Sequence, residues 1–333
     1  MERNRQVVLI ARPEGIPQAG HFALREVPVP KPGEGQFLIR NRYLSVDPAM
    51  RGWVSAAANY SAPVALDAVM RSIAVGEVIA SNHPDYPVGE HVCGMFGWQE
   101  YAVSDGADVW FRHDPEEAPL STALGVLGIN GITAYFALLE IGRPKPGDTV
   151  VVSTAAGAVG SAVGQIAKIL GCRTVGITSG DAKIALCREV YGYDAAISYR
   201  SGDLDAALAE ACPDGVNVYF DNTAGAISDA VYRHLAVGAR CVVCGTASVS
   251  SWDAWPTGPR VERHTLVKRA AIQGFLVFDY AGRFEEARTQ LAVWLADGRL
   301  AYREEVLDGL ELAPGAIAHL YAGGNLGKLV IRI

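Results

Sequence analysis

A glycine-rich segment near the middle of the chain has the spacing of a dinucleotide-binding loop. It runs STAAGAVGSAVG from residue 153, follows an apolar β-branched stretch and opens a stretch with helical periodicity. Gly157 would let the backbone approach a pyrophosphate, and Gly160, after Ala158 and Val159, would let helix and strand pack closely, although Ala155 replaces the first glycine of the usual pattern. The first amides of such a helix favour an anion. The segment therefore predicts a nucleotide cofactor.

The end of the next strand, RTVGI, distinguishes NADPH from NADH. An NAD site expects an Asp or Glu about 20 residues beyond the loop, where it accepts hydrogen bonds from the ribose hydroxyls. Residues 177–180 (ITSG) contain no acid, and Asp181 is interpreted as the N-cap of the following helix. Lys183 lies two residues further on, and a cation without a carboxylate suits the 2′-phosphate of NADPH. The alternative for Lys183 is a solvated helix lysine.

Regular alternation of strands and helices must position this loop. Apolar strands are expected at residues 149–153, 173–177, 195–198, 216–221 and 240–243, and helices at 161–170, 181–190, 204–212 and 226–234. The alternation predicts βαβ units and a parallel sheet, in an α/β protein. We further expect a helix at 131–141, a strand at 271–277 and a helix at 284–297.

The first 120 residues have a different character. Short alternating runs at residues 22–29, 36–46, 73–81 and 98–103 are separated by Pro and Gly, which indicates an antiparallel barrel or sandwich. The tail from residue 299 is mixed and ends in a strand at 328–333. A length of 333 residues agrees with about two domains.

Composition narrows the functional class. The net charge of −7 argues against nucleic acid or a membrane surface as a partner. The apolar run at residues 7–11 is too short for a signal peptide, and the uncharged stretch at 118–139 contains glycines and an asparagine. Six cysteines are ordinary for an intracellular protein, so a cytoplasmic location is expected.

Metal chemistry has little support in the sequence. Cys241 and Cys244 form a C-x-x-C on an expected strand, where an offset of three puts the side chains on opposite faces. His91 and Cys93 would share a strand face, but no third ligand is identifiable and no H-E-x-x-H or G-x-S-x-G motif is present. We expect no bound metal and chemistry carried by the nicotinamide.

Five segments together resemble one family along nearly the whole chain. They are YLSVDPAMRG, GMFGWQEY, STAAGAVGSAVGQIAKILGC, PDGVNVYFDN and GNLGK. The sequence is similar to the zinc-independent medium-chain reductases, specifically the group of leukotriene B4 dehydrogenase, prostaglandin reductase, curcumin reductase and 2-alkenal reductase. The resemblance implies a GroES-like β-barrel substrate domain over residues 1–123, a Rossmann NADPH-binding domain with a doubly wound parallel sheet over 124–298, and a tail over 299–333 that returns to the first domain.

The same resemblance implies a reaction. NADPH would deliver a hydride to the β-carbon of an α,β-unsaturated ketone or aldehyde, and negative charge would move to the carbonyl oxygen as an enolate before protonation. A hydrogen-bond donor near that oxygen stabilises the transition state. In this family the donor is a tyrosine hydroxyl, the ribose 2′-hydroxyl of the cofactor, or both.

The resemblance also assigns residues to the cofactor. Residues 157–160 would hold the pyrophosphate, and Lys183 and Tyr199 the 2′-phosphate. Asn222, Cys244 and Gly245 would line the cofactor path. Three further positions, Phe275, Leu276 and Val277, would pass close to the nicotinamide, and Asn325 would close the site.

The sequence departs from the family at two tyrosine positions. Family members often have Tyr where this chain has Ala49 and, further on, Ser250. Tyr60, in NYSAPV, is the remaining candidate for the catalytic hydroxyl, and a packing aromatic is its alternative. The two substitutions predict a roomier or differently shaped pocket, which Trp252 and Trp255 could refill.

Two other functions are compatible with the sequence. A quinone reductase of the same superfamily would share the glycine loop, and a crystallin-like protein that binds NADPH without catalysis would tolerate the missing tyrosines. The expected strand at residues 271–277 is apolar and late in the Rossmann sheet, so edge-to-edge pairing in a homodimer would bury it.

Overall fold

The chain forms two compact units, each with its own sheet. The computed structural model describes residues 3–56, 60–200, 202–249 and 256–333. Unit 1 comprises residues 1–124 together with 304–333, and unit 2 comprises residues 125–303. The last thirty residues thus belong to the same unit as the first part of the chain.

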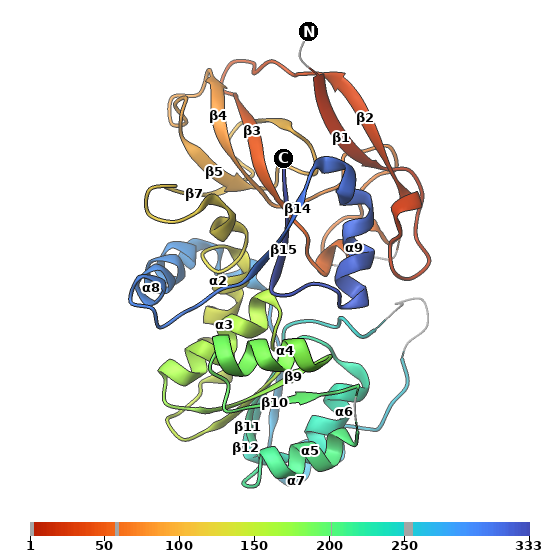
Figure 1. Ribbon diagram of the computed structural model, residues 1–333, viewed down its shortest axis with the longest axis vertical. Helices are drawn as coiled ribbons and strands as arrows, with labels where there is room; N and C mark the ends of the chain where they lie inside the picture. The colour runs from red at the N-terminus through yellow and green to blue at the C-terminus, as the bar shows by residue number, and fades with distance from the viewer. Residues whose placement is uncertain (1–2, 57–59, 201, 250–255) are drawn as a thin grey trace. The chain divides into compact units, whose positions relative to one another are not determined.

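Unit 2 is built on a parallel sheet whose described strands follow the order β10-β9-β8-β11-β12-β13 (Figure 1). The strands are β8 (Thr149–Ser153), β9 (Arg173–Thr178), β10 (Ala195–Ser198), β11 (Val216–Asp221), β12 (Leu235–Val243) and β13 (Ala271–Gly274). The chain winds outward from β8 to β10, then crosses back to β11 and winds outward the other way. The expected doubly wound Rossmann sheet is confirmed.

Helices alternate with these strands. They are α2 (Ile129–Phe136), α3 (Ala158–Ile169), α4 (Asp181–Ala185), α5 (Leu204–Ala211), α6 (Gly225–Arg233), α7 (Glu262–Lys268) and α8 (Phe284–Ala296). Strand β8, TVVVS, is buried at every position, as expected for a central parallel strand covered on both faces. Helix α3 packs on β8 and β9 and on α2, and α5 packs against α6.

Several element boundaries differ from the sequence-based expectations. The helix expected at 131–141 begins at Ile129, and after Phe136 it continues as a π-helical segment over Ala137–Gly142. The helix expected at 181–190 likewise becomes π-helical over Leu186–Val190. Gly180, not Asp181, is the N-cap of α4, and Asp181 is the first helical residue.

The strand expected at 271–277 is shorter than predicted. It ends at Gly274, because its partner β12 ends at Val243 opposite that residue. A 3₁₀ helix then runs over Val277–Arg283. The strand expected at 240–243 is longer than predicted and begins at Leu235.

Unit 1 contains a mostly antiparallel sheet. Its order is β14-β15-β3-β4-β5-β7, with β6 on β3, and a separate β1-β2 pair lies beside it in the same unit. The strands are β1 (Arg3–Leu9), β2 (Phe22–Pro28), β3 (Phe37–Ser45), β4 (Ala74–Ser81), β5 (His91–Gly94), β6 (Tyr101–Ser104), β7 (Val109–Arg112), β14 (Glu304–Asp308) and β15 (Lys328–Arg332). Its α-helices are α1 (Ala49–Val54) and α9 (Ala313–Ala322).

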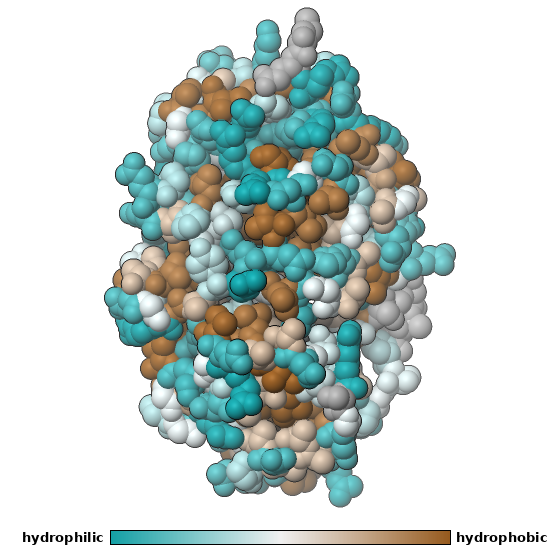
Figure 2. Space-filling view, viewed as in Figure 1, coloured by the Kyte–Doolittle hydropathy of each residue, from teal (hydrophilic) through white to brown (hydrophobic). Residues whose placement is uncertain are grey.

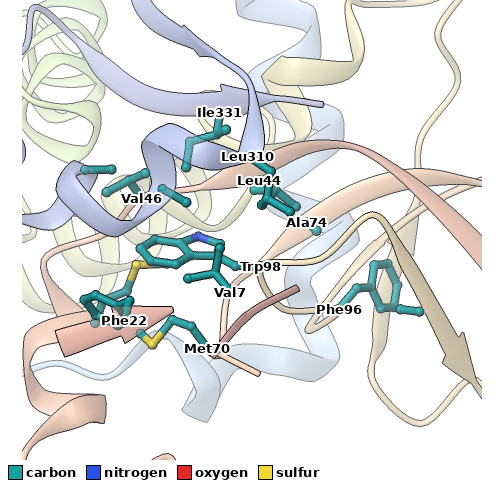
Figure 3. Packing of buried hydrophobic residues seen from close by; sticks show 14 of the residues in the cluster. Val7, Phe22, Leu44, Val46, Met70, Ala74, Phe96, Trp98, Leu310 and Ile331 are labelled. Atoms are coloured by element: carbon teal, nitrogen blue, oxygen red, sulfur yellow. The ribbon is translucent and has the colours of Figure 1, made fainter. Parts of the chain in front are cut away.

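The core of unit 1 joins both ends of the sequence. Trp98 is fully buried, its indole N–H donates to the Ser45 carbonyl oxygen at 3.1 Å, and its ring lies 5.7 Å from that of Phe22. Val7 from β1 and Leu310 and Ile331 from the C-terminal segment belong to the same buried cluster (Figure 3). Residues 304–333 are therefore part of this core.

The surface carries both apolar and hydrophilic residues. On the face shown in Figure 2, apolar residues gather in several groups, and hydrophilic residues lie between these groups. Within the residues that the structure describes, no helix is both long enough and apolar enough to cross a membrane.

Candidate functional site

The winding of the sheet in unit 2 marks one edge of it as the place for a ligand. Strands β8 and β11 are neighbours, but the chain leaves them in opposite directions along the sheet. In open α/β sheets, ligands bind outside the carboxyl ends of the strands at such a switch point. Here those ends are Ser153 and Asp221.

The glycine loop lies directly after β8. Gly157 is the N-cap of the 12-residue helix α3, so Ala158 and Val159 form its first turn. At Gly160 an added Cβ would clash with the Thr154 carbonyl oxygen and would lie 2.9 Å from the Cα of Ala155. The glycine is needed for close helix–strand packing, and the first amides of α3 remain available to an anion.

A buried tyrosine supports this loop from the side. The Tyr193 hydroxyl donates to the Gly160 carbonyl oxygen at 2.6 Å. Its ring fills the space beside Gly164 and Gly176, where added Cβ atoms would collide with it or with Ala155. Burial raises the pKa of Tyr193 well above its ordinary value, so it stays a neutral hydrogen-bond donor.

The candidate 2′-phosphate residues lie at the ends of the next two strands. The amide of Tyr199 donates to the Thr178 carbonyl oxygen at 3.0 Å, and that of Lys183 to the Gly180 carbonyl oxygen at 3.1 Å. Lys183 is partly buried and Tyr199 is 40% exposed. The guanidinium carbon of Arg200 lies 5.6 Å from the centre of the Tyr199 ring, which adds a second cation that the sequence interpretation missed.

Asn222 lies at the switch point itself. Its side-chain amide donates to the Ser153 carbonyl oxygen at 2.7 Å, and its backbone amide donates to the Ser153 hydroxyl at 2.8 Å. Cys244 and Gly245 follow β12, and their amides donate to the Asp221 carbonyl oxygen at 2.8 and 3.0 Å. The structure thus brings Asn222, Cys244 and Gly245 together next to the glycine loop.

The segment after β13 reaches the same edge of the sheet. The amide of Phe275 donates to the Val243 carbonyl oxygen at 3.0 Å, next to Cys244. Its ring stacks on Tyr280 with centres 5.3 Å apart. Leu276 is partly buried and Val277 is buried. Of the three expected nicotinamide neighbours, Phe275 is the one whose backbone is bonded to the end of β12.

Tyr60 and Asn325 belong to unit 1. Tyr60 is 53% exposed. Asn325 is buried, and its side-chain amide donates to the Gly327 carbonyl oxygen at 2.8 Å, within the GNLGK turn. The next amide, of Leu326, donates to a carboxylate oxygen of Glu305 at 3.0 Å, which ties this turn to β14.

A tyrosine from the C-terminal helix contacts the residue directly before Ala49, one of the two positions where family members often have Tyr. The Tyr321 hydroxyl on α9 donates to the Pro48 carbonyl oxygen at 2.9 Å, directly before Ala49. The guanidinium carbon of buried Arg51 lies 4.8 Å from the centre of its ring. Burial raises the pKa of Tyr321, and neighbouring Tyr60 raises it further against the opposing charge of Arg51. The two proposed refilling residues, Trp252 and Trp255, and the substituted position Ser250 lie outside the described residues.

The described side chains offer no cluster of metal ligands. Among the described ranges, no set of three or more His, Cys, Asp and Glu side chains could hold a metal ion. All six cysteines are free thiols, and all but the partly exposed Cys244 are buried. Burial, together with the charge of Asp221, raises the pKa of Cys244 to about 12.

Two of the site's polar residues carried no signal in the sequence interpretation. Ser153 ends the first strand and Asp221 ends the fourth, and sequence patterns assign such residues only to a strand end. The strand order places both at the switch point, and their contact depends on the β8–β11 pairing.

The chain is similar to known reductases along its whole length. Residues 5–111 match the family model described as the N-terminal domain of oxidoreductase, and residues 158–293 match the one described as zinc-binding dehydrogenase. The chain is 44% identical to the NADPH-dependent curcumin reductase of Escherichia coli K12, covering 100% of this chain and 97% of that protein. It is 35% identical to the NADP⁺-dependent 2-alkenal reductase of Nicotiana tabacum, covering 99% and 97%.

A solved structure extends the agreement to three dimensions. The structure of CurA from Vibrio vulnificus in complex with NADPH matches with a TM-score of 0.93 and 44% identity, covering 98% of both chains. The chain therefore belongs to the medium-chain dehydrogenase/reductase superfamily, in the group of curcumin, 2-alkenal and prostaglandin reductases.

Proposed function

We propose that this protein is an NADPH-dependent reductase of carbon–carbon double bonds conjugated to a ketone or an aldehyde. The main support for this proposal is the end-to-end similarity, at 44% identity, to an NADPH-dependent curcumin reductase. Curcumin contains a carbon–carbon double bond conjugated to a ketone, and a 2-alkenal contains one conjugated to an aldehyde. The shared chemistry defines the substrate class as small enones and enals.

The residues of unit 2 fit NADPH. Gly157 to Gly160 leave the first amides of α3 open to the pyrophosphate, and residues 177–180 at the end of β9 contain no carboxylate that would repel a 2′-phosphate. Lys183 and Tyr199, with Arg200 beside them, would hold that phosphate. Asn222, Cys244, Gly245 and Phe275 to Val277 would border the nicotinamide half, and Asn325 would close the site. When bound, NADPH supplies the hydride that the β-carbon of the substrate accepts.

The chain's own contribution to the chemistry is a hydrogen bond to the carbonyl oxygen as negative charge develops there. We assign this donor to Tyr60, whose exposed phenol belongs to unit 1 and whose hydroxyl can donate a hydrogen bond. A positioned donor of this kind stabilises the transition state more than the ground state. In this scheme unit 1 is the substrate domain, including its C-terminal segment, and unit 2 is the NADPH-binding domain.

Two further properties belong to the proposal. Strand β13 is an edge of the described sheet and all four of its residues are exposed, including the large apolar Ile272. An exposed apolar edge favours pairing with a second sheet, so we infer a homodimer joined through β13, which light scattering would report as twice the mass of one chain. Free thiols throughout fit the reducing conditions of the cytoplasm.

The test is NADPH oxidation with a matched panel: an enone, an enal, the corresponding saturated carbonyl compounds and a quinone. We expect turnover of the enone and the enal, with the saturated ketone or aldehyde as product by mass spectrometry. Turnover of the quinone alone would establish the quinone-reductase alternative. NADPH binding without turnover of any substrate would establish a catalytically silent binding protein.

A further inference from the structure

Asp221 is a buried carboxylate whose two oxygens are both used inside the fold. The side chain is at the end of β11 and the residue is 1% exposed. Oδ1 accepts hydrogen bonds from the amides of Thr223 at 2.9 Å and Ala224 at 2.8 Å, and from the Tyr219 hydroxyl at 3.1 Å. Oδ2 accepts one from the Ser228 hydroxyl at 2.6 Å. Weaker bonds to Oδ1 come from the hydroxyls of Ser153 and Thr223, at 3.4 and 3.3 Å.

Asp221 and its neighbour Asn222 connect the carboxyl ends of β8, β11 and β12 through hydrogen bonds. The Asp221 carbonyl oxygen accepts the amides of Cys244 and Gly245 after β12, and Asn222 is bonded twice to Ser153 at the end of β8. Figure 1 shows β11 and β12 side by side in unit 2, as their ladder requires. Asp221 therefore joins the residues that border the glycine loop to those proposed to border the nicotinamide.

The turn that follows is held in an unusual backbone conformation. Ala224 has φ of 58°, in the left-handed region that favours glycine, and Gly225 has φ of 63°. Such a conformation persists in a non-glycine residue only when its surroundings determine it. The bond from the Ala224 amide to Oδ1 of Asp221 fixes this turn at the start of α6.

The hydrogen bonds that Asp221 accepts, more than its negative charge, hold the turn that follows β11 in place. The donors to Asp221 named above are amides and hydroxyls, which compensate a buried carboxylate by hydrogen bonding. An asparagine oxygen in the Oδ1 position could accept the same backbone amides, and the Ser228 hydroxyl could turn to accept from the new amide group.

We propose that Asp221 is a positioning residue for the nicotinamide half of NADPH, acting through Asn222, Cys244 and Gly245. This inference rests on the proposed function, because it takes NADPH as the cofactor. It assigns Asp221 no contact with substrate. It predicts that the hydrogen bonds of residue 221 determine the affinity for NADPH. The affinity for the adenosine half of the cofactor should not depend on them.

The experiment compares two ligands in four proteins. The dissociation constants of NADPH and of 2′,5′-ADP, which lacks the nicotinamide half, are measured by calorimetry for the parent, Asp221→Asn, Asp221→Ala and Asp229→Ala. Asp229, on α6 one residue beyond Ser228, is the matched control. We expect Asp221→Ala to weaken NADPH binding roughly ten-fold or more and to leave 2′,5′-ADP binding within about two-fold. The substitution removes the carboxylate that accepts the Thr223 and Ala224 amides and so fixes the turn directly after Asn222.

Asp221→Asn should recover most of the NADPH affinity, and Asp229→Ala should match the parent. Unchanged NADPH binding by Asp221→Ala would overturn the inference, as would equal losses of both ligands, which would assign Asp221 to the stability of the whole domain. An Asn variant as weak as the Ala variant would also overturn it. A parent that binds neither ligand would instead refute the proposed cofactor, and so the proposed function.

Discussion

In the proposed function, the choice between NADPH and NADH depends on individual side chains that follow β9 and β10. Lys183→Ala removes a cation from the proposed 2′-phosphate site, and a hydrogen bond to a charged group contributes about 1.5–3 kcal/mol. We expect the KM for NADPH to rise roughly ten-fold or more and that for NADH to change little. Arg200→Ala should act in the same direction through the cation beside Tyr199. Steady-state kinetics with both cofactors would show this, and equal use of NADH and NADPH by the parent would contradict it.

Tyr60 is the proposed hydrogen-bond donor to the carbonyl oxygen of the substrate. Tyr60→Phe removes one hydroxyl and keeps the ring, so a loss of the oxyanion donor should lower kcat and kcat/KM together by about 10²-fold. The dissociation constant of NADPH should not change. Tyr321→Phe is the comparison, because its hydroxyl is already engaged with the Pro48 carbonyl oxygen. Parental kcat on an enone would remove Tyr60 from the mechanism and leave the cofactor ribose or water as the donor.

Packing between elements makes one helical glycine in α3 indispensable and another, in α9, replaceable. Alanine is the better helix former by about 1 kcal/mol, but at Gly164 its Cβ would collide with the buried ring of Tyr193, and overpacking costs about 1–3 kcal/mol. The ring cannot move aside, because its hydroxyl is bonded to the Gly160 carbonyl oxygen. Gly315 in α9 has no atom within 4 Å of an added Cβ. Thermal unfolding should therefore show Gly164→Ala less stable than the parent and Gly315→Ala equally or more stable.

A carboxylate that joins α3, β9 and β10 gives the protein part of its acid sensitivity. Asp194 accepts hydrogen bonds from the Lys168 ammonium and the Thr174 amide, both at 2.7 Å. Partial burial opposes its ionisation, but these bonds outweigh burial and hold the pKa of Asp194 below its ordinary value. The stabilisation is present above the unfolded pKa of about 4 and is lost as the pH falls through the folded pKa. Denaturant unfolding of the parent and Asp194→Asn should differ at pH 7 and converge toward pH 2. A constant difference would contradict the assignment.

Elements were predictable where the local pattern decides them. β8, β10 and β11 have the predicted bounds because each is an apolar run closed by turn residues. β13 is shorter than predicted because its length depends on where β12 ends, which is a property of the pairing. The glycine loop follows from spacing, whereas the Ser153–Asp221–Asn222 contacts depend on two strands 68 residues apart becoming neighbours. Likewise, nothing in the sequence connects Tyr321 with Pro48, 273 residues away.

For the molecule as a whole, a buried ion pair joins early and late parts of the chain. The Lys328 ammonium, on β15, lies 2.8 Å from a carboxylate oxygen of Asp47 and also donates to the Ser45 hydroxyl and the Val46 carbonyl oxygen. Both ionised residues are buried. Removing one partner of such a pair costs about 3–5 kcal/mol, because the other charge is left uncompensated. Lys328→Met should lower the Tm of unit 1 by about 10 °C, measured by calorimetry.

A second substitution makes that prediction specific. Adding Asp47→Asn to Lys328→Met removes the remaining charge, so the double variant should unfold at a higher temperature than Lys328→Met alone. Lys168→Met, which breaks the more exposed pair with Asp194, is the control and should cost less. If the single and double variants unfold together, the charge of Asp47 is not what destabilises the protein.

The division of unit 1 between residues 1–124 and 304–333 sets an order of events during synthesis. About 180 residues must be translated after Leu124 before β14 exists, which takes about 10–40 s at the usual rate of 5–20 residues per second. Throughout that time the edge of β3 that later pairs with β15 lacks this partner strand, and Asp47 lacks its ion-pair partner Lys328. Unit 2 is contiguous and can fold on the ribosome first. A messenger truncated before codon 328 would therefore yield an intact unit 2 attached to a unit 1 that lacks β15 and cannot be completed.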